Sequence, residues 1–218
     1  MPCTARWIRA AFAFVIVLAV TTPCRAQSTE TANVFEPAYA DAIRSINPNV
    51  REPLSRQYAR ALLSNAHRLG VDPNLVMAVV TVESHWNARA VSSSGARGLG
   101  QFLPGTARDL GIDPRSPGSN LRGVTDYLHQ LLGLFKSSRN AMRQAIASYN
   151  AGPNAVRHYG IPRRGETPRY VVKVLATWRS LRARLGTHPR VEEIALVLDA
   201  AADANAAQNA YWGAKSRR

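Results

Sequence analysis

One carboxylate of this sequence stands where the helical pattern predicts an apolar residue. Glu83 follows Val76, Val79 and Val80 at spacings of seven, four and three residues, so in a helix all four side chains lie on one stripe. Burial among valines disfavours an ionised carboxylate, and so does a position near the negative C-terminal end of a helix. Both effects are expected to raise the pKa of Glu83. A carboxylic acid that stays protonated near neutral pH can act as a general acid.

The spacing alone leaves a second interpretation open, in which Glu83 marks the helix end and turns toward solvent. The segment that follows favours the first interpretation. Four glycines fall within residues 95–105, and glycine lets a backbone approach a ligand closely. Ser92 and Gln101 add neutral hydrogen-bonding groups. The segment has no cluster of His and Asp ligands and no phosphate-binding loop with its lysine.

Three ordered motifs contain these residues. They are Glu83-Ser84, Asn87, Ala90-Val91-Ser92 and Gly95-Ala96-Arg97-Gly98-Leu99-Gly100-Gln101; then Ala147-Ser148-Tyr149-Asn150-Ala151-Gly152-Pro153 with Ala155-Val156; and then Glu166-Thr167 with Tyr170-Val171 and Val174. Together they resemble the soluble lytic transglycosylases (SLT domains) of the lysozyme-like superfamily, over residues 58–181. The resemblance implies an all-α, lysozyme-like domain whose central buried helix ends at Glu83.

The resemblance also implies a reaction, that of a carbon–oxygen lyase acting on peptidoglycan. Such an enzyme cleaves the β-1,4 bond between N-acetylmuramic acid and N-acetylglucosamine without water. A Glu matching Glu83 protonates the departing oxygen and then accepts the proton of the muramic acid 6-hydroxyl, which closes a 1,6-anhydro ring. Glycosidases that use water usually need two carboxylates, whereas residues 84–108 contain no Asp or Glu. No metal or organic cofactor is implied.

Further roles carry over position by position. Tyr149 matches a tyrosine near the catalytic acid, where its hydroxyl can position the acid and support developing charge. The implied substrate-binding residues are Ser92 beside the N-acetyl group, Gln101 and Asn150 as hydrogen-bonding contacts, and Phe102 and Leu103 in the apolar groove wall.

Three other positions are interpreted separately. Glu166 precedes a helix start at Thr167-Pro168, where its charge suits the helix dipole, and we expect a structural role for it. Gly100 stands where the family usually has Met, so we expect a side chain to be missing from the groove wall or from its support, and the backbone to be freer. Trp86 can either stack on a sugar or pack beneath the loop.

Helices must position all of these residues. Apolar periodicity predicts helices near residues 39–46, 53–69, 73–84, 121–135, 141–149 and 167–185, and an Ala-rich last helix from Pro189 to about Ala210. Gly70 is a stop signal, and Asp72-Pro73 combines an N-cap with a first-turn proline. Residues 87–105 are expected to form a loop. No pair of strands is evident, so the predicted class is all-α.

The expected organisation is a signal peptide over 1–26, an N-terminal extension over 27–50, the catalytic domain over 51–186 and a C-terminal helical extension over 187–218. The first segment has basic residues, a short apolar run and small residues up to Ala26, as exported proteins do. An uncleaved anchor and a lipid-anchored Cys24 are the alternatives. Cys3 and Cys24 both fall in this segment, so the mature chain would have no disulfide.

The net charge of +14, from 28 Lys and Arg against 14 Asp and Glu, indicates an anionic partner or environment. Export argues against nucleic acid as the partner, and the sequence contains no recognisable nucleic-acid-binding motif. The expected partner is the glycan of peptidoglycan, in the periplasm or outside the cell, with no stable membrane span after signal cleavage. Two alternatives stay open: a hydrolase resembling goose-type lysozyme, and a wall-binding component of a secretion or conjugation apparatus.

Overall fold

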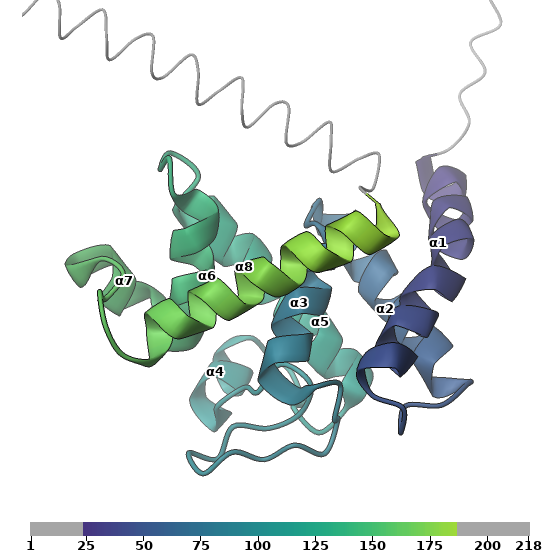
Figure 1. The fold of residues 1–218 in the computed structure, drawn as a ribbon, viewed down its shortest axis with the longest axis horizontal. Helices are drawn as coiled ribbons and strands as arrows, with labels where there is room; N and C mark the ends of the chain where they lie inside the picture. Colours follow the sequence, from purple (N-terminus) through teal and green to yellow (C-terminus); the bar gives the residue numbers. More distant parts are fainter. Residues whose placement is uncertain (1–23, 187–218) are drawn as a thin grey trace, which may run out of the picture.

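The computed structural model describes residues 24–186, and this part of the chain is helical (Figure 1). Its helices are α1 (Cys24–Ile46), α2 (Leu54–Leu69), α3 (Pro73–Ser84), α4 (Pro104–Asp109), α5 (Pro117–Leu134), α6 (Ala141–Ala151), α7 (Pro153–Tyr159) and α8 (Glu166–Leu185). In place of a sheet, these residues form two isolated bridges, Val91 with Arg97 and Arg97 with Phe102. The predicted all-α class is confirmed. Most of the predicted signal peptide and the whole predicted last helix lie outside the described residues.

Local signals place the ends of α2 and α3 where the sequence predicted them. Gly70 adopts a left-handed conformation (φ 66°) and ends α2. Asp72 caps α3 by accepting a hydrogen bond from the backbone N–H of Asn74. The other carboxylate oxygen of Asp72 accepts a hydrogen bond of 2.7 Å from the indole N–H of Trp178. The start of α3 is therefore also attached to α8.

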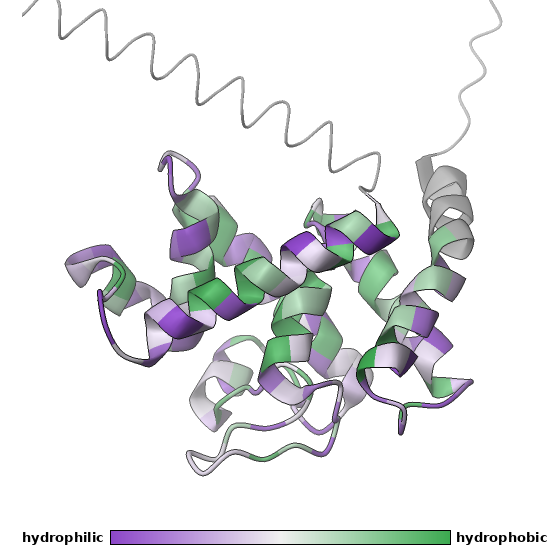
Figure 2. Cartoon of the chain, viewed as in Figure 1, coloured by the Kyte–Doolittle hydropathy of each residue, from purple (hydrophilic) through white to green (hydrophobic). Residues whose placement is uncertain are grey.

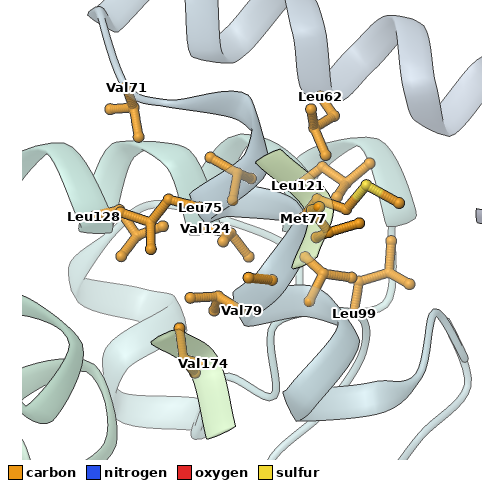
Figure 3. Packing of buried hydrophobic residues seen from close by; sticks show 14 of the residues in the cluster. Leu62, Val71, Leu75, Met77, Val79, Leu99, Leu121, Val124, Leu128 and Val174 are labelled. Carbon is orange, nitrogen blue, oxygen red and sulfur yellow. The ribbon is translucent and has the colours of Figure 1, made fainter. Parts of the chain in front are cut away.

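The centre of the core is α3, which packs against α2, α5 and α8. Val76, Val79 and Val80 are fully buried, as the stripe predicted. Figure 3 shows buried side chains of these helices and of the loops on either side of α3 packed together; the labelled residues are Leu62, Val71, Leu75, Met77, Val79, Leu99, Leu121, Val124, Leu128 and Val174. Figure 2 shows α3 as one of the most hydrophobic helices.

The helix predicted near residues 39–46 is the last part of the longer α1, which packs against α2. Tyr39 and Ile43 are buried in the main core. Glu36 is buried too, and Arg60 of α2 holds its two oxygens through hydrogen bonds of 2.9 and 3.1 Å. The second half of the expected extension 27–50 therefore contributes to the same core as the rest of the chain.

Two short helices were not predicted. The six residues of α4 are too few to display an apolar period, so the expected loop 87–105 gave no sign of it. The helix predicted over 141–149 runs two residues further, to Ala151, and Pro153 then begins α7, because proline fits the first turn of a helix. Across residues 24–186, no helix combines the length and the apolar character needed to span a bilayer.

Candidate functional site

A cleft of about 720 Å³ opens beside the C-terminal end of α3. Its walls come from the loop after α3, from α4, α5 and the end of α6, and from the start of α8. All seven site residues inferred from the sequence line it: Glu83, Ser92, Gln101, Phe102, Leu103, Tyr149 and Asn150. The fold therefore gathers side chains from distant motifs around one hollow.

Glu83 occupies the last turn of α3 and is partly buried. The chain turns sharply after it, because His85 and Trp86 both adopt left-handed backbone conformations. Burial raises the pKa of Glu83 from its ordinary value of 4.5 to about 7, the hydroxyl of Tyr170 opposes this rise, and the charge of Glu166 adds to it. The predicted rise in pKa is confirmed, and the interpretation in which Glu83 turns freely to solvent is wrong.

Tyr170 is the partner of Glu83 that the sequence analysis missed. Its hydroxyl donates a hydrogen bond of 2.5 Å to Oε1 of Glu83. Tyr170 lies on the buried face of α8 with Val171 and Val174, and burial, with the neighbouring Glu83 charge, raises its pKa well above the ordinary value. The hydroxyl therefore remains a proton donor. A phenol on an otherwise apolar stripe was the available signal.

We expect Tyr170→Phe to raise the pKa of Glu83 further. The phenol donates to the carboxylate and so favours its ionised form, which lowers the pKa. Without this donor, the rise in pKa that burial causes is no longer opposed by the hydrogen bond. Carboxyl carbon NMR of the labelled protein during a pH titration measures this change directly. Tyr127→Phe is the matched control, since Tyr127 lines the cleft without bonding Glu83. An unchanged or lower pKa of Glu83 in Tyr170→Phe would remove Tyr170 from this role.

The hydroxyl of Tyr149 makes a different contact from the one expected. It donates a hydrogen bond of 3.0 Å to the carbonyl oxygen of Gly100, while the ring packs against Tyr127 and Phe102 at centroid distances of 5.3 and 5.9 Å. Burial raises the pKa of Tyr149 well above the ordinary value, and the charge of Glu83 adds to the rise. Tyr149 thus lies within electrostatic reach of the acid but is held by the glycine motif.

The expectation that Gly100 thins the cleft wall is wrong. A Cβ atom at this position would lie 2.3 Å from Cγ2 of Val124, 2.8 Å from the hydroxyl of Tyr149 and 2.9 Å from Cε2 of Phe102. Neighbouring side chains already fill the space that the family's usual Met would need. The backbone is not free either, because both its N–H and its carbonyl group are hydrogen-bonded.

Asn120, which the sequence analysis also missed, holds the loop in place from α5. It is fully buried, and its Oδ1 accepts a hydrogen bond of 2.7 Å from the N–H of Gly100. Its amide nitrogen donates to the carbonyl oxygens of Arg97 (3.2 Å) and Pro114 (2.9 Å). One side chain therefore satisfies three backbone groups of the cleft wall and its support. A lone Asn beside the apolar stripe of a helix gave no clue to these distant partners.

The predicted polar contacts are already hydrogen-bonded within the protein. Oγ of Ser92 accepts from the N–H of Ala96 at 3.0 Å. The amide nitrogen of Gln101 donates to two loop carbonyl groups, so its carbonyl oxygen is the group left to meet a ligand. Asn150 accepts from Thr167 at 2.8 Å and donates to Glu166 at 3.1 Å. These contacts hold the three side chains in fixed orientations at the cleft.

The aromatic and apolar side chains of the loop differ in exposure, so that some present surface to the cleft and others support the loop from the core. Phe102 is almost completely buried, whereas Leu103 is 45% exposed and offers an apolar surface. Trp86 is fully buried, stacks on Tyr58 and donates its indole N–H to Thr81. The packing interpretation of Trp86 is therefore correct, and stacking on a sugar is excluded.

Glu166 supplies a second carboxylate to the cleft. It lies in the first turn of α8 with its side chain exposed, and its charge contributes to the raised pKa of Glu83. The sequence analysis gave Glu166 a structural role at a helix start and did not predict that it shares the cleft with Glu83, because the two residues come from distant motifs. Within the described part of the chain, no three His, Cys, Asp or Glu side chains are grouped as a metal site would require.

Comparison with known proteins finds a family whose model matches this chain. A family model described as the transglycosylase SLT domain matches residues 61–169, which is half of the 218 residues. The membrane-bound lytic murein transglycosylase F 1 of Alkalilimnicola ehrlichii is 34% identical over 113 residues, 50% of this chain and 23% of its own length. The membrane-bound lytic murein transglycosylase F of Photobacterium profundum is 35% identical over 85 residues, 37% of this chain and 16% of its own length.

Two solved structures with a similar fold are also lytic transglycosylases. An inactive mutant of the lytic transglycosylase Slt from Pseudomonas aeruginosa superposes with a TM-score of 0.51 and 28% identity, covering 77% of this chain and 32% of its own. The 70 kDa soluble lytic transglycosylase of Escherichia coli gives a TM-score of 0.50 at 23% identity, over 78% of this chain and 32% of its own, and supports the fold alone. The predicted lysozyme-like fold is confirmed. In every one of these pairs the chain spans less than a third of the relative.

Proposed function

Because the chain belongs to the transglycosylase SLT domain family, we propose that it is a peptidoglycan lytic transglycosylase, which cleaves the β-1,4 bond between N-acetylmuramic acid and N-acetylglucosamine. The observation that carries the proposal is Glu83, a partly buried carboxyl group with a pKa of about 7 at the edge of a large cleft. Such a group is protonated in a useful fraction of molecules at neutral pH and can also accept a proton there.

The reaction needs both of these properties in sequence. Protonated Glu83 gives its proton to the glycosidic oxygen as the bond from that oxygen to the anomeric carbon breaks. The resulting carboxylate then takes the proton of the muramic acid 6-hydroxyl as its oxygen bonds to the anomeric carbon. Glu83 ends protonated, no water is consumed, and the product carries a 1,6-anhydro ring. Tyr170 would hold the carboxyl group in one orientation throughout.

The remaining cleft residues suit an uncharged sugar. Ser92, Gln101 and Asn150 offer neutral polar groups, and Leu103 offers an apolar surface. The carbonyl oxygen of Gln101 would accept from a sugar hydroxyl or an N-acetyl N–H. Ser92, whose hydroxyl oxygen accepts a hydrogen bond from the N–H of Ala96, would contact the N-acetyl group.

Tyr149→Phe is expected to slow turnover by roughly tenfold with little loss of stability, since the hydroxyl lies at the cleft while the ring provides the packing. Steady-state rates on purified peptidoglycan, with thermal unfolding in parallel, measure the two effects. Tyr58→Phe is a suitable control, because Tyr58 is buried against Trp86 and does not line the cleft. A wild-type rate in Tyr149→Phe would exclude a catalytic role for this hydroxyl.

One observation favours a second candidate, a hydrolase of the same fold. Glu166 lines the cleft with Glu83, and a second carboxylate can activate water on the opposite side of a sugar ring. Against this, Glu166 is exposed and accepts a hydrogen bond from Asn150, which suits a structural role equally well. The two candidates differ in whether water enters the product.

Mass spectrometry of the muropeptides that the purified protein releases decides between them. A transglycosylase yields 1,6-anhydro ends, each lighter by one water than the reducing ends left by a hydrolase. Repeating the digestion in water enriched in oxygen-18 provides an internal control, because only hydrolysis incorporates the label at the cleaved bond. Reducing ends that carry the label would overturn the proposal.

We also place the protein in the periplasm or outside the cell, on the strength of the expected signal peptide over residues 1–26. The named relatives are membrane-bound murein transglycosylases, which supports the cell envelope as its place of action. N-terminal sequencing of the protein recovered from its native envelope fraction tests this, with Gln27 expected as the first residue. A function within a secretion or conjugation apparatus would be compatible with the same activity.

A further inference from the structure

The segment over residues 153–165 forms a projection on the rim of the cleft. The residues that bracket it, Gly152 and Glu166, both line the cleft. Between them, Val156 of α7 is buried in the core and Ile161 packs against it. Figure 1 shows α7 and the loop into α8 extending outward at one end of α8. The projection is thus fixed at both ends and in its middle, and it stands beside any ligand that leaves the cleft at this end.

The projection carries positive charge without compensation. It contains Arg157, Arg163 and Arg164, here termed the rim arginines, all three exposed, and it contains no Asp or Glu. Figure 2 shows much of the chain in α7 and in the loop into α8 in the colours of hydrophilic residues. The ion pairs among residues 24–186 involve arginines of α1, α2 and α5 instead. The rim arginines therefore remain available to an anion.

The cleft itself, in contrast to the projection, has no basic side chain in its lining. Its ionisable lining consists of two carboxylic acids, Glu83 and Glu166, and two tyrosines, with no Lys or Arg. A neutral glycan suits such a cleft, whereas an anionic part of the ligand would be repelled by Glu166 and attracted by the neighbouring projection. The site therefore separates a neutral binding region from a cationic one.

We propose that the rim arginines bind the carboxylate groups of the peptide attached to the muramic acid of the substrate. This inference rests on the proposed function, because that function places muramic acid in the cleft. Each muramic acid bears its peptide on a side branch of the sugar, so the peptide must leave the glycan at the edge of the cleft. Guanidinium groups pair with carboxylates in a two-pronged geometry, which gives recognition as well as attraction.

General attraction of a basic protein to an anionic wall is the competing explanation, and the chain offers a matched control for it. Lys136, Arg139 and Arg143 are exposed as well, carry the same total charge and form no ion pair among the described residues. They lie at or before the start of α6, whereas the cleft is lined by the opposite end of that helix.

The experiment compares two triple variants on two substrates. The rim variant is Arg157→Gln, Arg163→Gln and Arg164→Gln, and the control variant is Lys136→Gln, Arg139→Gln and Arg143→Gln. The substrates are intact peptidoglycan and glycan strands from which an amidase has removed the peptides. We expect the rim variant to lose at least about fivefold in the ratio of kcat/KM for peptide-bearing over peptide-free glycan. The control variant should keep the wild-type ratio.

Equal losses on both substrates, equal losses in both variants, or no loss in the rim variant would each overturn the inference. Co-sedimentation with the two substrates provides a second measurement that does not depend on turnover. In a Glu83→Gln background, the rim substitutions should weaken binding to peptide-bearing material selectively. If the wild-type protein bound the peptide selectively but turned over neither substrate, the proposed reaction would fail while the peptide-binding surface would stand.

Discussion

Glu83→Gln is expected to reduce turnover by about a thousandfold or more, because an amide can neither donate nor accept the proton that both halves of the reaction transfer. The fold should survive, since Gln has nearly the same shape and its carbonyl oxygen can still accept from Tyr170. Release of muropeptides from purified peptidoglycan measures the loss. Asp109→Asn is the matched control, as it exchanges an exposed carboxylate of α4 for an amide. Turnover by Glu83→Gln at the wild-type rate would exclude Glu83 as the acid.

The same variant should also change how stability depends on pH. The pKa of Glu83 is higher in the folded protein, about 7, than its ordinary value of 4.5, so the folded state binds the proton more tightly than the unfolded state does. The contribution of Glu83 to stability is therefore complete below about pH 4.5 and is lost as the pH rises through about 7. The difference between the two pKa values corresponds to about 3 kcal/mol.

Glu83→Gln removes this dependence. We expect wild type and variant to unfold at similar temperatures near pH 4, and the variant to be the more stable near pH 9, by up to about 3 kcal/mol. Thermal unfolding at the two pH values measures the effect, and Asp109→Asn should show no comparable gain. Equal stability of Glu83→Gln and wild type at alkaline pH would contradict a raised pKa for Glu83.

Asn120→Ala is expected to destabilise the protein by about 3 kcal/mol and to lower activity as well. The substitution removes the hydrogen-bonding partner of the Gly100 N–H and of two carbonyl groups, in surroundings where water cannot readily replace it. The carbonyl oxygen of Gly100 also holds Tyr149, so loosening this loop should disturb the cleft.

Urea unfolding of Asn120→Ala measures the loss of stability, and peptidoglycan turnover measures the effect on the cleft. Asn140→Ala provides the comparison, because Asn140 is an exposed residue before α6 whose side chain makes no capping bond. A stability within about 0.5 kcal/mol of wild type would mean that the loop does not depend on this amide.

Much of the fold could be predicted because its determinants are local. The caps at Gly70 and Asp72 and the valine stripe of α3 depend on residues only a few positions apart, and the structure has them as expected. The raised pKa of Glu83 followed from the same stripe, since burial is its largest cause. Short α4 was missed because six residues cannot establish a period.

The rest of the site depends on contacts that no spacing reveals. Tyr170 lies 87 positions from the carboxyl group to which it donates, and Asn120 lies 20 positions from Gly100. The expectation of a gap beside Gly100 was wrong for the same reason. The side chains that fill this space come from α5, from α6 and from Phe102. Chain topology alone brings these groups together.

The two attachments between α3 and α8 have a consequence for the acid. Trp178 donates a hydrogen bond to Asp72 just before the first turn of α3, and Tyr170 donates one to Glu83 in the last turn of α3. Helix α8 therefore holds α3 at both of its ends. A change that shifts α8 near Trp178, far from any bound sugar, is therefore expected to alter the surroundings of Glu83 and with them its pKa. The acidity of one carboxyl group is in this sense a property of two helices and not of the cleft alone.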